Sequence, residues 1–156
     1  MTHYLAGLAF TFAALSSPAQ ADEASFLEGF QICMQEAPSM QELWIALEAA
    51  GWQEYPGMSE IERQHNMGDT NVFSLVGELL DQPGCSIMDE TVSIGFATKV
   101  LVTTLEANYS GRWSTGQNAV MGTPVWRLLT DVGTLEFSVH EDLSGAGASI
   151  GFELRP

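Results

Sequence analysis

The residues best suited to chemistry lie near the C-terminal end of the chain, where His140 precedes two carboxylates, Glu141 and Asp142. Side chains alternate between the two faces of a strand, so His140 is expected to share a face with Ser138 and Glu136. An imidazole beside carboxylates can act as an acid–base group or hold a metal weakly. We take His140, Glu136 and Asp142 as weak acid–base or metal candidates, because an ordinary solvated strand end has the same composition.

Other metal and cofactor signatures are missing from the sequence. His65 lies near Glu60 and Glu62 and is an equally weak candidate, while His3 belongs to the N-terminal leader described below. No two histidines have the H-x-x-x-H or H-x-H spacing of a structural zinc site. No D-x-[DN]-x-[DN]-G run indicates an EF-hand, which leaves only loose calcium binding at an acidic pair. The sequence therefore predicts no resident metal and no cofactor.

Residues 147–151, Gly-Ala-Ser-Ile-Gly, match the G-x-S-x-G pattern of a hydrolase nucleophile elbow. In those hydrolases the acid and the histidine follow the serine along the chain. Only five residues follow Gly151, and none of them is histidine. We therefore reject Ser149 as a nucleophile and interpret the segment as the start of a strand. The Gly145–Gly147 run is no nucleotide loop either, because no helix follows it.

The N-terminal segment has the pattern of a secretory signal peptide. Tyr4 to Leu15 forms a short apolar core, and Ala19-Gln20-Ala21 fits a small-x-small cleavage site. The apolar run is shorter than the about 20 residues that span a membrane. We predict a signal peptide over residues 1–21 and one domain over residues 22–156. The mature chain would then lie in the periplasm or, as the second choice, outside the cell.

Cys33 and Cys85 are the two cysteines of the chain. An exported protein meets an oxidising compartment, in which paired cysteines form disulfides. We predict a Cys33–Cys85 disulfide, which would close a loop of about 50 residues and stabilise the fold by roughly 4 kcal/mol. Two buried free thiols are the alternative, and a redox role is disfavoured because there is no Cys-x-x-Cys spacing.

The charge of the chain is strongly unbalanced, with 20 acidic and 5 basic residues and a net charge of −15. Binding to nucleic acid needs clustered Lys and Arg, so this balance argues against nucleic acid and anionic membranes as partners. A cationic protein is the favoured partner, although net charge acts first on solubility. Arg112 and Trp113 are the candidate partner-binding residues, because both types are enriched at hot spots. The alternative is that Trp113 folds back onto the core.

Three helices are expected from apolar residues at helical spacing. The first covers residues 24–37, and the second runs from a capping box at Ser39–Glu42 to a stop at Gly51. The third is a long central helix over residues 89–108, with Asp89 as its N-cap. Because many residues in that last segment are β-branched, two shorter strands are the alternative there.

The sheet is predicted from apolar–polar alternation, which indicates strands over residues 72–80, 85–88, 125–130, 135–140 and 150–155. Residues 52–71 and 111–122 are polar and are expected to be mainly exposed connections. The first of them can also contain a short strand near Trp52 and a turn of helix near residues 59–64. Residues 131–133 have the composition of a three-residue hairpin loop. The resulting order, α-α-β-β-α-β-β-β, predicts an α+β fold in which two N-terminal helices and the central helix pack on an antiparallel sheet.

These observations favour a small exported acidic protein that acts as a non-catalytic binding or accessory module. Its most concrete form is a charge-steered inhibitor or immunity-like protein against a basic enzyme, such as one that lyses cell walls. One alternative is a small hydrolase-type enzyme that uses His140 and Glu136. Another is a structural component of the cell envelope.

Overall fold

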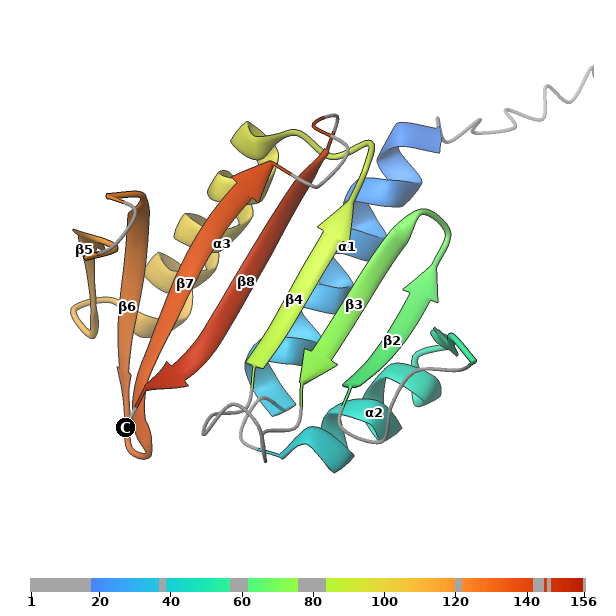
Figure 1. The fold of residues 1–156 in the computed structure, drawn as a ribbon, viewed down its shortest axis with the longest axis horizontal. Coiled ribbons are helices and arrows are strands. Elements are labelled where there is room, and N and C mark those ends of the chain that lie inside the picture. The colour runs from blue at the N-terminus through green and yellow to red at the C-terminus, as the bar shows by residue number, and fades with distance from the viewer. Residues whose placement is uncertain are drawn as a thin grey trace, which may run out of the picture.

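Three helices pack on one face of an eight-stranded antiparallel sheet (Figure 1). The structure is a computed structural model, and it describes residues 18–36, 39–56, 62–75, 84–119, 122–141, 145 and 147–155. The helices are α1 (Pro18–Glu36), α2 (Met40–Ala49) and α3 (Ile94–Tyr109). The strands are β1 (Gln53–Glu54), β2 (Glu62–Met67), β3 (Thr70–Leu75), β4 (Gly84–Asp89), β5 (Trp113–Gln117), β6 (Pro124–Thr130), β7 (Gly133–Glu141) and β8 (Ala148–Arg155). The predicted α+β class is confirmed, although the predicted element order lacked β1, β2 and β5.

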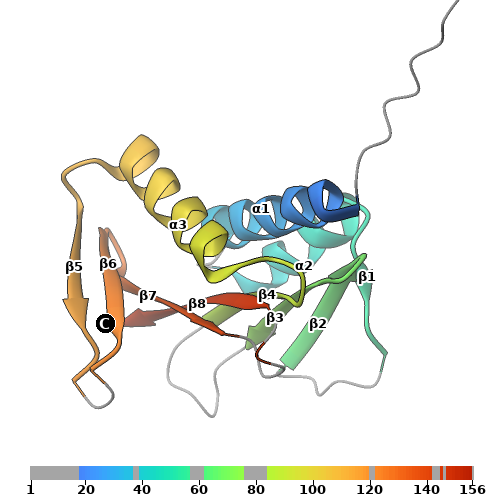
Figure 2. The ribbon, with the colours of Figure 1, turned by 90° about the horizontal axis from the view of Figure 1, so that it is seen from above.

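The strand order, β1-β2-β3-β4-β8-β7-β6-β5, places the last strand at the centre of the sheet. β8 pairs with β4 on one side and with β7 on the other. α3 carries the chain from β4 to the far edge, and the chain returns to the centre through successive antiparallel pairs. Figure 2 shows all three helices on one side, and the β5–β6 hairpin turned out of the plane of the central strands toward the other side.

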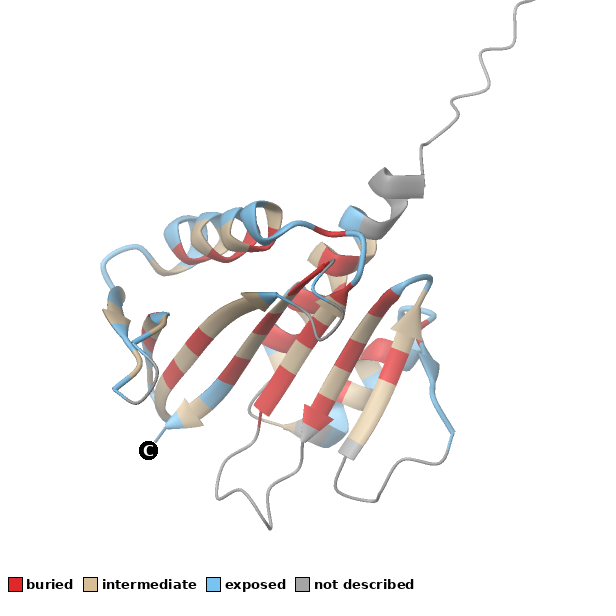
Figure 3. Cartoon of the chain, turned by 45° about the horizontal axis from the view of Figure 1, so that its top comes forward, coloured by how far each residue is buried: buried red, intermediate tan, exposed pale blue. Residues whose placement is uncertain are grey.

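The core lies between the helices and the facing side of the sheet. Buried and half-buried residues alternate along the central strands, as the period of two requires (Figure 3). The largest fully buried side chains come from all layers: Phe26, Phe30, Leu43, Leu47, Leu101, Leu105, Ile87, Phe137 and Ile150. Phe30 of α1 meets Phe137 of β7 edge to face, with ring centroids 6.5 Å apart. The described helices therefore cover one face of the sheet.

The predicted disulfide between Cys33 and Cys85 is confirmed, because the two sulfur atoms lie at bonding distance. Both residues are buried, and the bond ties α1 to β4 near the middle of the sheet. Residues 1–17 of the predicted leader lie outside the described residues, so cleavage after Ala21 stays a prediction. Among the described helices, none is long and apolar enough to cross a membrane.

The helix signals in the sequence were right at α2 and partly wrong at α3. The Ser39 hydroxyl accepts a hydrogen bond from the Glu42 N–H at 3.4 Å, and Gly51 has the positive φ that ends the helix. α3, however, starts at Ile94, with Ser93 rather than Asp89 as its N-cap. Asp89 instead ends β4 as a buried residue. A β-strand followed by a capped turn thus replaces the first helical turn that we predicted.

Two segments that we predicted to be mainly exposed connections contain strands. Residues 52–71 include β1, β2 and the start of β3, and residues 111–122 include β5. The predicted strand over residues 72–80 is described only as far as Leu75, and residues 76–83 lie outside the described residues. The predicted three-residue hairpin loop is a two-residue turn, because Thr130 already pairs with Gly133. Gly133, the last residue of that predicted loop, has a positive φ and is the first residue of β7.

Candidate functional site

A groove of about 340 Å³ lies on the face of the sheet that the described helices leave open. Its lining residues come from strands β3, β4, β6, β7 and β8 and from the β5–β6 connection. They are Phe73, Gly84, Cys85, Ser86, Asn118, Thr123, Val125, Glu136, Ser138, His140, Gly151, Phe152, Glu153 and Arg155. The groove is thus built by the centre of the sheet, with the turned-out hairpin closing one end.

The floor of the groove is a row of small residues that runs across the strands. Ser86 of β4 is opposite Gly151 of β8, and Gly151 is opposite Ser138 of β7. The same row continues to Phe73 on β3 at one end and to Val125 on β6 at the other. Bulky side chains at the ends and small ones between them leave a trough perpendicular to the strands.

One wall of the groove carries two ion pairs. Glu136 and Glu153 are opposite each other across β7 and β8. Arg127 Nε lies 2.8 Å from Glu136 Oε2, and Arg155 Nη2 lies 2.7 Å from Glu153 Oε2. The Arg127 guanidinium occupies the space that a side chain at Gly116 of β5 would fill. Each carboxylate of this wall is therefore matched by a guanidinium, and the four charges sum to zero.

His140 lines the groove on the side away from the ion pairs, and it shares its face with Ser138 and Glu136 as predicted. These two acid–base candidates are not neighbours on that face, however. His140 and Glu136 are four residues apart along one strand, which separates their backbones by about 13 Å. Glu136 is also engaged by Arg127. Asp142 lies outside the described residues, and in the part of the chain that is described no three His, Cys, Asp or Glu residues group as a metal site.

The G-x-S-x-G segment is the start of β8, as we interpreted it. A Cβ atom at Gly147 would collide with the backbone carbonyl of Asp89, so close packing against the end of β4 explains this glycine. Ser149 is opposite His140 in the β7–β8 pair and opposite Met88 in the β4–β8 pair. The motif is thus explained by the packing of a central strand, and it does not form a nucleophile elbow.

The two candidate partner-binding residues, Arg112 and Trp113, make contacts within the chain. The Trp113 indole packs against the core, and its Nε1 donates to Glu106 Oε2 at 3.2 Å. Arg112 Nη2 donates to the Leu129 carbonyl at 2.9 Å and lies 3.7 Å from Asp131 Oδ1. The geometry favours the alternative that we gave for Trp113, a side chain folded back onto the core.

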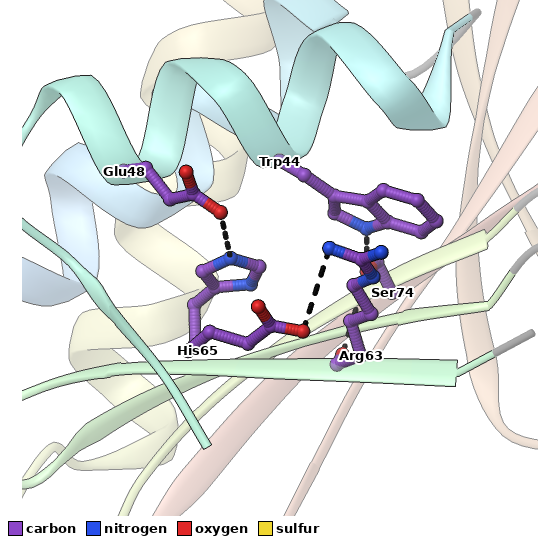
Figure 4. A network of polar contacts seen from close by, with 6 residues as sticks. Trp44, Glu48, Arg63, His65 and Ser74 are labelled. Atoms are coloured by element: carbon purple, nitrogen blue, oxygen red, sulfur yellow. Dashed lines mark hydrogen bonds and ion pairs between the residues drawn. The ribbon is translucent and has the colours of Figure 1, made fainter. Parts of the chain in front are cut away.

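A second polar cluster lies between α2 and β2, on the helix side of the sheet (Figure 4). The Arg63 guanidinium stacks on the Trp44 ring, 3.9 Å from its centroid, and pairs with Glu54 at 3.4 Å. Trp44 Nε1 donates to Ser74 Oγ at 2.7 Å. Sequence reasoning missed this cluster, because nothing in the polar run of β2 indicates that α2 covers it.

His65 is the most unusual member of this cluster, because its side chain is 0% exposed. It lies in the segment 52–71, which we expected to be mainly exposed, and for this residue that expectation is wrong. Neither ring nitrogen has a hydrogen-bond partner among the described residues, and Nε2 lies 3.9 Å from Glu48 Oε1. Burial lowers the pKa of His65 from 6.5, although Glu54 and Glu48 oppose this by attracting the charged form. The positive charge of Arg63 also lowers the pKa of His65.

We expect this histidine to make the fold less stable in mild acid. Its pKa is lower in the folded chain than in the unfolded chain, so the unfolded state binds more protons below pH 6.5. The destabilising effect of His65 is therefore absent well above pH 6.5 and grows as the pH falls below that value. The free energy of unfolding in urea, measured from about pH 7.5 to about pH 5.5, should fall in the wild type. The decline should be shallower in His65→Leu, and equal slopes in the two proteins would contradict the assignment.

Comparisons with protein-family models, with characterised proteins and with solved structures each give no match to this chain. Its function has to be inferred from the groove, from the charge distribution and from the disulfide.

Proposed function

We propose that the chain is an exported, acidic, non-catalytic binding module whose ligand lies in the groove on the helix-free side of the sheet. The disulfide fits an oxidising compartment, and the N-terminal pattern is typical of export. The groove is of the size of small-molecule sites, which begin at about 300 Å³. Its polar groups are set around a small-residue floor, as in a site that orients a ligand.

The observation that carries this proposal is the row formed by Ser86, Gly151 and Ser138 at the centre of the sheet. A sheet that needed only to be soluble on this face would be covered by long polar side chains. Glycine within a central strand weakens the strand and is typical of a site where another group approaches the backbone closely. Catalysis by the predicted candidates is disfavoured, because the backbones of His140 and Glu136 are about 13 Å apart along one strand.

Gly151→Val is the variant that tests the groove directly. A Cβ at this position would meet the Ser138 and Ser86 side chains at 3.8 Å, an ordinary van der Waals contact, so the strand has room for a side chain here and its methyl groups would occupy the floor of the groove. We expect folding stability to stay within about 1 kcal/mol of the wild type, because valine suits a strand better than glycine does. We expect ligand binding to be lost.

That loss can be measured by screening a library of small polar fragments. Binding is followed through the amide chemical shifts of the labelled protein. Fragments should shift amides of β4, β7 and β8 in the wild type and leave the same amides unchanged in Gly151→Val. Gly95→Val is the matched control, since Gly95 lies exposed on α3, where a Cβ would meet the Ser93 hydroxyl at an ordinary contact distance of 3.8 Å. Fragments that bind equally to wild type and Gly151→Val, or only to other surfaces, would exclude the groove as the site.

A cationic protein partner is a second candidate function, and the helix layer favours it. The helices carry exposed Glu23, Glu42, Glu48 and Glu106, while Lys99 is their one basic residue. A basic cell-wall lytic enzyme that bound this surface should lose affinity steeply between about 50 mM and about 500 mM salt. Glu42→Gln/Glu106→Gln should weaken that binding more than Asp69→Asn/Glu90→Gln does. Binding that ignores salt would exclude this candidate.

A further inference from the structure

We infer that the groove binds a short chain of uncharged sugar residues that lies across the strands. This inference rests on the proposed function, since it names the class of ligand for the same site. Three properties of the groove support it: its elongated shape, its balanced charge, and the mixture of hydroxyl, imidazole and aromatic groups that line it.

The shape favours a linear ligand. The floor row crosses five strands, from Phe73 on β3 to Val125 on β6. Four gaps between strands give a length of about 19 Å. Across the groove, the walls at His140 and Glu136 lie about 13 Å apart along β7, measured between backbone positions. A trough of these proportions suits one chain of a few linked units better than a compact molecule.

The charge favours an uncharged ligand. The protein carries −15 overall, yet the two ion pairs of the groove wall bring together two of its five basic residues with two carboxylates. A cationic ligand would meet Arg155, and an anionic ligand would meet Glu136, Glu153 and the negative field of the whole chain. A neutral ligand meets neither penalty. The two ion pairs can offer it paired donors and acceptors at one wall.

The lining chemistry matches sugar hydroxyls. Ser86 and Ser138 each present a hydroxyl that can donate and accept, and so does every hydroxyl of a sugar ring. The imidazole of His140 adds another polar group on the opposite side of the floor. Phe73 gives an aromatic surface at one end, on which the apolar C–H face of a sugar ring can pack. A lipid would leave these polar groups without partners, which is costly.

A peptide is the competing linear ligand, and the position of the groove argues against it. Extended peptides bind sheets mainly by adding a strand at an edge, where free backbone groups are available. The floor of this groove lies at the centre of the sheet, where β8 pairs on both sides. Its backbone groups are therefore engaged in the ladder, and side chains must supply the contacts. A zwitterionic peptide is kept as an arm of the test.

The experiment titrates the full protein with three neutral hexasaccharides and follows amide chemical shifts. The probes are β-1,4-linked glucose, β-1,4-linked N-acetylglucosamine and α-1,4-linked glucose. We expect at least one to shift amides along β4, β8 and β7. Gly151→Val should weaken that binding more than about tenfold and Phe73→Ala about tenfold, while Gly95→Val leaves it unchanged. The affinity should change little with salt, because no net charge is neutralised.

The outcomes separate the ligand class from the proposed function. If none of the three sugars shifts groove amides, the inference is wrong. A peptide of alternating Lys and Glu that binds instead, and loses binding in Gly151→Val, would leave the groove as a binding site with a different ligand. If neither sugars, peptide nor fragments perturb the groove, the inference and the proposed function both fail.

Discussion

Reduction of the Cys33–Cys85 disulfide should lower the free energy of unfolding by about 4 kcal/mol. The bond links residues 52 positions apart. In the chain-entropy description, releasing a loop of this length restores about 4 kcal/mol of conformational freedom to the unfolded chain. The folded state changes little, because both cysteines stay buried among other core residues. For a chain of this size, the melting temperature should fall by about 8 to 16 °C.

The measurement compares urea unfolding of the wild type with and without a reducing agent. The double variant Cys33→Ala/Cys85→Ala is the control, since reductant should leave its stability unchanged. The variant should be at least as unstable as the reduced wild type, because shortening two buried side chains also creates cavities. A wild type whose unfolding midpoint ignores the reductant would contradict a structural role for this bond.

The parts of the fold that the sequence predicted correctly are specified by neighbours in the chain. The Ser39–Glu42 cap and the stop at Gly51 act within one helical turn of the residues that they order. Cys33 follows Phe26 and Phe30 at helical spacing, which indicates a shared face toward the core, and all three are buried. In each case the physical cause lies within a few residues.

The errors arose where distant residues decide the structure. The polar run of β2 resembles a loop, yet Arg63 and His65 point toward α2, where Trp44 and Glu48 cover them. No property of the run itself indicates that cover. β5 was missed for a similar reason. Its sequence has no clear strand pattern, and it is held in place by its pairing with β6 and by the Trp113–Glu106 hydrogen bond.

The candidate site shows the same division. A period of two was enough to predict that Glu136, Ser138 and His140 share a face of one strand. The groove, however, depends on Ser86 and Gly151, which reach Ser138 only through the register of three strands. That register follows from the central position of β8, the last strand of the chain. Sequence reasoning alone therefore found the part of the groove that β7 contributes and missed the floor residues of β4 and β8.

Asp89 was predicted to cap a helix, and its actual position gives it a larger role. Its side chain is 0% exposed. Oδ1 accepts hydrogen bonds from the Thr91 N–H at 2.8 Å, the Thr91 hydroxyl at 2.7 Å and the Val92 N–H at 3.2 Å. Oδ2 accepts from the Thr70 hydroxyl at 2.6 Å. One carboxylate thus joins β3, the end of β4 and the turn that leads into α3.

Asp89→Ala should therefore destabilise the protein by about 3 to 5 kcal/mol, because it leaves the buried Thr70 hydroxyl and Val92 N–H without an acceptor. Asp89→Asn should cost less, about 1 to 2 kcal/mol. Its amide oxygen can still accept hydrogen bonds from the turn, and its amide NH₂ can donate to the Thr70 hydroxyl. The remaining cost arises because a neutral acceptor forms weaker hydrogen bonds than a carboxylate. Glu90→Ala, which removes the exposed neighbouring carboxylate, should stay within about 0.5 kcal/mol of the wild type. Urea midpoints of the three variants rank these costs. Equal stability of Asp89→Ala and Glu90→Ala would mean that the buried carboxylate does not hold this junction together.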